Sequence, residues 1–228
     1  KQKTAYEIMP SLVGSEMCIR DSGNTIYVFG GDDEKTDNQV KEVNSNGEVV
    51  WYWAAKDYFE NSSYSDIERG GWTHTNAVTR LDNGNTLINL RNFALTVEVD
   101  SQGSVVRTFD WSNYGSKTDP HDPEVEADGD LLVCLQNDSP YQAVEINIEN
   151  SSVMWTYYRS GLRTVRDCDR LPNGNTLMVG VLAEESVIFE VTPSGEVVWQ
   201  LRLAGYPATG NTPSGKGPGW FYKAERIG

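Results

Sequence analysis

Apolar and polar residues alternate along short runs of this chain, and turns rich in Gly, Asn and Asp separate the runs. The run 86–92 reads Thr-Leu-Ile-Asn-Leu-Arg-Asn, and the run 95–100 reads Leu-Thr-Val-Glu-Val-Asp. Successive side chains of a strand point to opposite faces, so a period of two is typical of strands packed face to face. The pattern predicts strands along most of the chain and no helix within the repeated runs.

The runs recur as one cassette, written four times in outline: a turn, Gly-Asn-Thr-Leu, a short gap, Val-x-Glu-Val, a second turn and Val-Val-Trp. Its anchor glycines are Gly23, Gly84, Gly129 and Gly174, and the last three are 45 residues apart. A period of this size is in the range of propeller blades. The sequence therefore predicts an all-β fold, a partial β-propeller of about four four-stranded blades.

The last three cassettes predict where the strands lie, with the first strand of each cassette innermost, lining a shared central channel. The expected strands are 74–81, 86–92, 95–100 and 105–109, then 124–126, 131–136, 143–148 and 153–157, then 166–171, 176–179, 187–191 and 197–199. The segment 219–227 predicts the start of a fifth cassette. The segment 53–71, between the first two cassettes, is expected to be a loop that shapes which molecule binds or simply bridges blades.

Residues 1–22 do not follow this pattern. The stretch 11–22 resembles the translation of a sequencing-library adapter, a contaminant of metagenomic reading frames, and the likeness covers about 6–22. We therefore interpret 1–22 as a non-native segment and 23–228 as the partial propeller domain. On this interpretation the first blade lacks its innermost strand; the alternative is a native strand from Leu12 to Ile19.

Charge and composition exclude some partners. A formal net charge of -14 argues against nucleic acid, because binding phosphates needs Lys and Arg. No apolar stretch approaches the roughly 18 residues of a membrane span. Cys134 and Cys168 show no metal-ligand spacing, so we expect no metal and interpret both as buried apolar residues rather than a disulfide.

Candidate chemistry comes from the innermost strands. Asn76, His121 and Arg166 each lie eight residues before an anchor glycine, so three blades are expected to present them at equivalent positions. His74 lies two residues before Asn76 and would face the same way, because side chains alternate along a strand. The two histidines of the chain would then both lie near the channel, which favours a functional over a structural role.

Arg91 follows the next strand and would add a second cation. A guanidinium offers a planar fork of donors to sulfate, phosphate or carboxylate, although an exposed rim charge is an equal alternative for Arg91 alone. Together the five residues predict a receptor for an oxyanion. Asp122, Asp167 and Asp169 interleave with them and would orient ring nitrogens or form salt bridges.

These motifs carry a family resemblance. Trp72-Thr-His-Thr-Asn-Ala-Val78, the Asn-Gly-Asn-Thr-Leu-Ile run with Arg91, and Pro120-His-Asp-Pro123 together resemble the arylsulfotransferase family, and the similarity covers 23–228. The resemblance implies a six-bladed, periplasmic or otherwise exported enzyme. It would transfer a sulfuryl group from a phenolic sulfate ester to a phenol without a nucleotide donor or other cofactor, through a sulfated histidine.

Carried over by motif, His121 matches the nucleophile, and His74 with Asn76 matches the His-x-Asn pair. Arg91 matches the sulfate-binding arginine, whereas Arg166 stands where a further His would fit the repeat. A family histidine on an earlier blade has no counterpart. With about four of six blades, this chain is itself expected to be inactive or nearly so.

Two other functions remain open. One is a non-catalytic propeller that binds a ligand or a protein. The other is a propeller that holds a quinone cofactor, for which Trp51, Trp155 and Trp199 are poor candidates. These three recur at one outer-strand position and are better explained as residues that pack blades together. The natural donor, the acceptor and the oligomeric state are not predicted.

Overall fold

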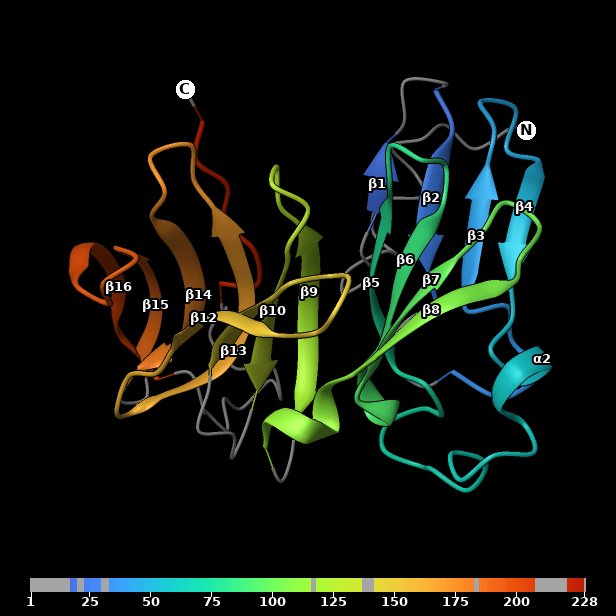
Figure 1. The fold of residues 1–228 in the computed structure, drawn as a ribbon, viewed down its shortest axis with the longest axis horizontal. Coiled ribbons are helices and arrows are strands. Elements are labelled where there is room, and N and C mark those ends of the chain that lie inside the picture. Colours follow the sequence, from blue (N-terminus) through green and yellow to red (C-terminus); the bar gives the residue numbers. More distant parts are fainter. Residues whose placement is uncertain are drawn as a thin grey trace. The chain divides into compact units, whose positions relative to one another are not determined.

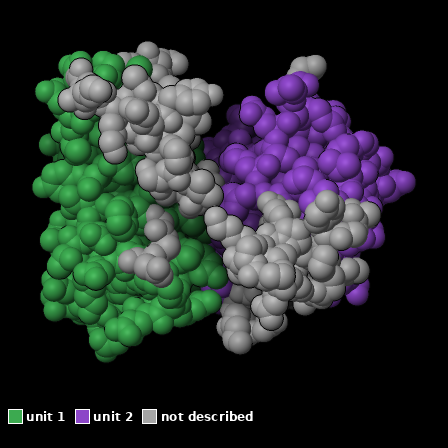
Figure 2. All heavy atoms as spheres, turned by 180° about the vertical axis from the view of Figure 1, so that it is seen from behind, with its two compact units in different colours: residues 1–108 green, residues 109–228 purple. Residues whose placement is uncertain are grey.

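The computed structural model describes residues 17–19, 23–29, 33–115, 118–136, 142–182, 185–207 and 221–227 (Figure 1). The chain divides into two compact units, residues 1–108 and 109–228, which Figure 2 shows in green and purple. Each unit is described by itself.

Unit 1 contains two four-stranded antiparallel sheets, each a meander in chain order. The first sheet is β1 (Met17–Ile19), β2 (Thr25–Val28), β3 (Val40–Val43) and β4 (Val49–Trp53), and the second is β5 (Thr75–Arg80), β6 (Thr86–Leu90), β7 (Leu95–Val99) and β8 (Val105–Asp110), whose end passes the boundary between the units. β5 packs against β1 and β2, so the first strand of the second sheet lies on the preceding sheet.

Unit 2 repeats this architecture. One sheet is β9 (Asp119–Val125), β10 (Leu131–Gln136), β11 (Ala143–Ile146) and β12 (Val153–Tyr157), and the other is β13 (Leu162–Arg170), β14 (Thr176–Leu182), β15 (Glu185–Val191) and β16 (Val197–Pro207). β13 packs against β9 and β10. The four sheets confirm the predicted all-β fold of about four four-stranded blades.

Two expectations about elements are wrong. The first sheet does not lack its first strand, because Met17–Ile19 pairs antiparallel with β2, Met17 opposite Tyr27. The origin proposed for residues 1–22 stays a prediction. The repeats also contain helical turns, η2 (Arg91–Phe93) between β6 and β7 and η3 (Trp111–Tyr114) after β8. Alternation marks strands only, so it gives no signal for a single helical turn in a connection.

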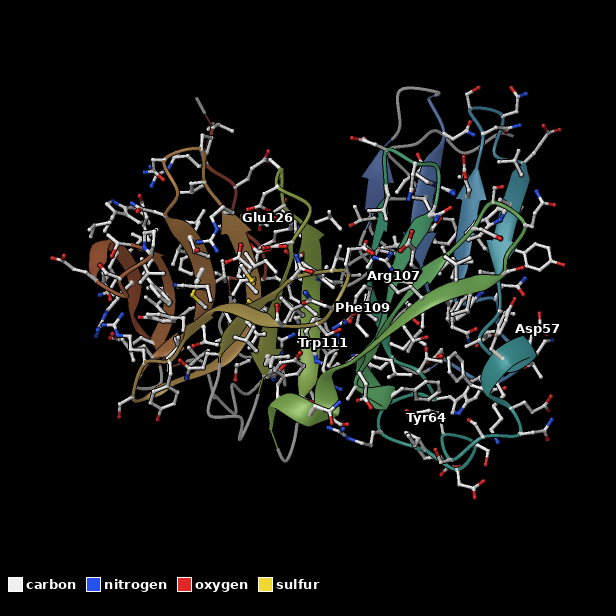
Figure 3. The ribbon with its side chains drawn as sticks, viewed as in Figure 1. Asp57, Tyr64, Arg107, Phe109, Trp111 and Glu126 are labelled. Atoms are coloured by element: carbon white, nitrogen blue, oxygen red, sulfur yellow. The ribbon has the colours of Figure 1, made fainter. Side chains whose placement is uncertain are left out.

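The segment between β4 and β5 is not only a loop. It contains α2 (Lys56–Phe59), and its aromatic residues Phe59 and Tyr64 pack against the core of unit 1. Tyr64, labelled in Figure 3, stacks on Phe93 with ring centroids 4.7 Å apart, and Trp72 meets the same ring edge-on. Aromatic pairs of this kind add to the energy of burial. The segment therefore anchors the residues that precede β5.

The Gly-Asn motif owes its recurrence to a hydrogen-bonded turn. Gly84 and Gly174 have φ of 88° and 83°, a region that favours glycine. The amide nitrogens of Asn83 and Asn85 donate to Oε1 of Glu98, at 3.3 and 2.6 Å. Asn173 and Asn175 bind Glu190 in the same way. Each turn thus holds the glutamate of the third strand of its own sheet.

Consecutive sheets within a unit are joined by one recurring contact, which we call the inter-sheet clamp: an Arg that ends a first strand, a Glu on the third strand of the preceding sheet, and a Trp on its fourth strand. In unit 1, Arg80 pairs with Glu42 and lies 5.1 Å from the Trp51 ring centroid. In unit 2, Arg170 pairs with Glu145 and lies 4.9 Å from Trp155. The prediction that these tryptophans pack blades together is confirmed.

Each unit has its own apolar core between its sheets. In unit 1 the core includes Ile26, Ile88 and Val97, and in unit 2 it includes Leu132, Met178 and Phe189. Cys134 and Cys168 are buried free thiols in the second core, as predicted. Within the described ranges, no helix is long and apolar enough to cross a membrane.

Candidate functional site

The repeat places three of the five candidate residues as expected, on first strands. Asn76 lies on β5, His121 on β9 and Arg166 on β13. His74 comes just before β5, and Arg91 begins η2 rather than ending a strand. His74, Asn76 and Arg91 belong to unit 1, and the other two belong to unit 2.

A buried carboxylate holds His74 in place. The backbone at His74 has φ of 48°, a left-handed conformation that is uncommon for residues other than glycine. Asp33, which is 3% exposed, accepts from the His74 backbone N at 2.9 Å and from the Thr73 N and Oγ1 at 3.1 and 2.7 Å. Backbone strain of this kind persists only where the surroundings fix it, and these hydrogen bonds to Asp33 do so.

The imidazole of His74 has a defined tautomer. Its Nδ1 lies 2.7 Å from the carbonyl oxygen of Gly70, and because a carbonyl oxygen only accepts, Nδ1 carries the proton. In the neutral ring Nε2 then keeps its lone pair. His74 can therefore offer Nε2 as a base or, when protonated, as a hydrogen-bond donor.

Arg91 is connected to the loop that carries His74. Its Nη1 donates to Oδ1 of Asn92 at 3.2 Å. The Asn92 side chain donates to the carbonyl oxygen of Gly71 at 2.8 Å, and its backbone N donates to that of Thr73 at 2.9 Å. The structure thus brings Arg91 and His74 into one network. Asp33 and Asn92, which build it, were missed by the sequence argument.

Asn76 belongs to a different network from His74. It is 4% exposed, and its Oδ1 accepts from the Asn89 side chain of β6, whose own Oδ1 accepts from Thr96 of β7 at 2.8 Å. The predicted alternation from His74 to Asn76 does not apply, because the left-handed residue 74 interrupts the extended backbone. Asn76 carries hydrogen bonds across three strands of its own sheet.

In unit 2, His121 and Arg166 lie on neighbouring first strands. His121 is 3% exposed and is opposite Cys134 on β10. Both first strands have register shifts there, between Leu132 and Cys134 in one ladder and between Arg163 and Asp167 in the other. Burial lowers the pKa of Arg166, whose guanidinium carbon lies 5.2 Å from the Tyr222 ring centroid.

Three carboxyl groups of the same two first strands lie close to one another. Asp122, Asp167 and Asp169 each place an oxygen within 4.8 Å of the others. Burial and, next, its hydrogen bond with Asp122 raise the pKa of Asp167 to about 9. Burial, followed by the charge of Asp122, raises the pKa of Asp169 to about 6, and burial with the charge of Asp169 raises that of Glu124 to about 7. Part of this set is protonated at neutral pH.

The cation at this cluster is a lysine of the chain itself. Nζ of Lys223 lies 3.0 Å from Oδ1 of Asp122 and 3.6 Å from Oδ1 of Asp167. The backbone N of Ala224 donates to the other oxygen of Asp167 at 2.7 Å. Carboxylate oxygens in such a cluster suit a divalent cation chemically, but here they bind an ammonium group, so we assign no metal to them.

Unit 1 also contains a cavity of about 620 Å³ next to the His74 loop. Its lining includes Asp66 and Glu68 from the segment before β5, Glu34, and Trp72, and Nζ of Lys35 lies 5.8 Å from the Trp72 ring centroid. The 53–71 segment, expected to shape acceptor choice or simply to bridge blades, thus lines part of this cavity.

Comparison with known proteins supports the fold and no more. No family model and no curated protein matches the chain. Among solved structures, a Bacteroides caccae protein of unknown function has a TM-score of 0.56 and 19% identity over 83% of this chain and 68% of its own. Virginiamycin B lyase from Staphylococcus aureus, a propeller, has a TM-score of 0.52 and 14% identity over 82% of this chain and 55% of its own.

The class of protein follows from these observations. The described residues form four consecutive four-stranded meanders, and in each unit an Arg at the end of a first strand joins that sheet to the preceding one. Together with the similarity to propeller structures, this defines a β-propeller domain. The chain spans about half the length of the lyase structure. At these identities the likeness extends to the fold alone.

Proposed function

We propose that this chain is part of a propeller enzyme that transfers a sulfuryl group from a phenolic sulfate ester to a phenol. The observation that carries the proposal is that His121 and Arg166 occupy the same repeat position on neighbouring first strands. His121 is buried, and the guanidinium of Arg166 has the donors that bind an oxyanion. The arylsulfotransferase motifs supply the reaction class. The resemblance also assigns His74, Asn76 and Arg91 of unit 1 to the reaction, although the Asn76 side chain is hydrogen-bonded within its own sheet.

The proposed reaction has two halves. An imidazole nitrogen of His121 attacks the sulfur of the donor, the bond from sulfur to the ester oxygen breaks, and the phenolate leaves with the electron pair and takes up a proton. A second phenol then gives up its proton, its oxygen attacks the sulfur, and the N–S bond breaks to restore the imidazole. Arg166 would stabilise charge on the sulfuryl oxygens.

Carboxyl groups on the first strands that carry His121 and Arg166 are proposed to serve the proton transfers. A leaving phenolate needs an acid that is still protonated near neutral pH, and the pKa of Asp167, at about 9, and of Glu124, at about 7, meet this need. Neutral carboxyl groups also repel a sulfate ester less than carboxylates do. Cofactor-free chemistry and export from the cytoplasm remain parts of the proposal that derive from the resemblance.

One observation favours a second candidate, a non-catalytic propeller that binds a ligand. Asp122, Glu124, Asp167 and Asp169 form an acidic cluster on β9 and β13, which suits a cationic ligand better than an anion. Such a protein would bind an organic cation, and His121→Ala would leave its affinity for that cation unchanged.

Turnover of 4-nitrophenyl sulfate with phenol as acceptor distinguishes the two. The assay uses a longer form of the protein that contains residues 23–228 and completes the propeller. We expect ping-pong kinetics, and His121→Ala should lower kcat/KM by on the order of a thousandfold or more. Lys41→Met, on β3, is a control that should leave the rate unchanged. A folded wild-type protein that releases no nitrophenolate would favour the binding protein, and equal measurable rates for wild type and His121→Ala would contradict the role of His121.

A further inference from the structure

The cavity of unit 1 is bounded by residues of two segments, 33–35 and 65–72, which hydrogen bonds tie together. The backbone N of Trp72 donates to the carbonyl oxygen of Asp33 at 2.8 Å, and its indole Nε1 donates to that of Tyr64 at 2.9 Å. Trp72 also packs in the apolar core of unit 1. The walls are therefore formed before any ligand enters, which lowers the cost of binding.

The described residues that line the cavity carry an excess of negative charge. The acidic ones are Asp33, Glu34, Asp66 and Glu68, and the cation among them is Lys35. In the described part of the chain, no hydrogen bond or ion pair engages the carboxyl groups of Glu34 and Glu68. Asp66 accepts a hydrogen bond from Oγ of Ser65 at 3.1 Å. Such a lining attracts a cation that enters from solvent.

An ammonium group already lies at the aromatic wall of the cavity. Nζ of Lys35 is 5.8 Å from the centroid of the Trp72 ring, within the range of a cation–π contact. Among aromatic residues, tryptophan attracts cations most strongly. The ammonium of a lysine is carried on a flexible four-carbon stem, so it can leave the ring when another cation binds there. The contact thus marks a place at which this cavity accepts a cation.

The size and lining of the cavity fit an organic cation rather than a metal ion. A metal ion needs several oxygen ligands close to one another. Among the described residues, the groups of three carboxyl oxygens within 4.8 Å of one another include no residue of this lining. A volume of about 620 Å³ is typical of sites for small organic molecules, and Ile67 and Trp72 supply apolar and aromatic wall.

We propose that this cavity binds a small organic ammonium ion. Its cationic group replaces the ammonium of Lys35 at the Trp72 ring, and the acidic lining balances its charge. The site is made of other residues than the acidic cluster on β9 and β13, and it does not depend on the sulfuryl-transfer reaction. Gly70 connects it to His74, because Gly70 lines the cavity and its carbonyl oxygen accepts from Nδ1 of His74.

Choline and its neutral isostere, 3,3-dimethylbutan-1-ol, test the site by calorimetric titration of the full chain. We expect choline to bind at least about tenfold more tightly, because the two molecules share a shape and only choline is charged. Lys35→Ala should strengthen choline binding about threefold, because a competing cation is removed. Glu68→Gln should weaken it about threefold, and the double variant with Asp66→Asn about tenfold. The control Glu60→Gln, in the same segment but outside the lining, should not change it.

NMR spectroscopy locates the bound cation. Choline should shift the indole N–H signal of Trp72 and the imidazole signals of His74. Equal binding of choline and its isostere, or no choline binding by wild type and Lys35→Ala, overturns the inference. Choline binding that is weakened by Asp169→Asn and not by Glu68→Gln would place the cation at the cluster on β9 and β13, which overturns the inference as well.

Discussion

The guanidinium of Arg80 reaches from the end of β5 to Glu42 on β3 of the preceding sheet, with 2.7 Å between Nη2 and Oε2. The two side chains are 8% and 7% exposed. Removing one partner of a buried ion pair leaves an uncompensated charge, so we expect Arg80→Met to lower the free energy of unfolding of unit 1 by about 3 kcal/mol. Urea denaturation followed by tryptophan fluorescence measures this loss.

Arg226 makes the same kind of ion pair with Glu190 on β15, which is the matched comparison. The Arg226 side chain is 46% exposed, so Arg226→Met should cost about 1 kcal/mol or less in unit 2, near the value of a surface ion pair. Equal losses in the two variants would show that burial does not set the strength of these ion pairs.

Asp33 is expected to control the conformation of His74. In Asp33→Ala the backbone N–H groups of Thr73 and His74 lose their acceptor, and we expect unit 1 to lose about 3 kcal/mol because several hydrogen bonds to one charged group are removed. Amide hydrogen exchange should rise at both residues. The variant Asp37→Ala, on the same loop, is the control; unchanged exchange at His74 in Asp33→Ala would contradict the assignment.

The stability of unit 2 should depend on pH through Glu126, labelled in Figure 3 at the turn after β9. Burial and then the charge of Glu124 raise its pKa to about 8, whereas in an unfolded chain Glu titrates near about 4.3. Between about pH 4 and pH 8 the folded state therefore binds more protons than the unfolded state. The free energy of unfolding should fall as pH rises through this window.

The variant Glu126→Gln isolates this contribution. It should flatten the fall in the free energy of unfolding between about pH 4 and pH 8, because the side chain no longer titrates. Urea denaturation at several pH values gives the curve, and Glu149→Gln, at an exposed turn, serves as the control. An unchanged slope in Glu126→Gln would contradict the raised pKa.

Cys134 and Cys168 should be unreactive in the folded protein. Both are fully buried, and burial raises the pKa of Cys134 to about 11 and that of Cys168 well above its usual value, so little thiolate is present. In a Cys18→Ser background, a chromogenic thiol reagent should report no reaction until urea is added, and then two thiols. Rapid labelling without urea would contradict the buried placement.

The fold was largely predictable because the repeat carries local signals. Gly84 and Gly174 mark turns with positive φ, and the alternation around them defines strands whose partners are close in sequence. The site was less predictable. Alternation from His74 to Asn76 failed because Asp33, distant in sequence, holds residue 74 in a left-handed conformation.

Residues that act between sheets gave the weakest sequence signal. Arg80 and Arg170 share a repeat position, but their partners lie on the preceding sheet, and no local pattern names them. Lys223 was missed for a further reason. The step from Arg170 to Arg226 is longer than the 45-residue spacing of the earlier glycines, so the repeat did not place Lys223 opposite Asp122 and Asp167.

The central claim is that His121 carries the sulfuryl group between donor and acceptor. Intact-mass measurement of the completed propeller that contains residues 23–228, after incubation with 4-nitrophenyl sulfate, tests it most directly. The account predicts a gain of one sulfuryl group that disappears on addition of phenol and is absent in His121→Ala. A folded protein that gains no mass and releases no nitrophenolate would contradict it.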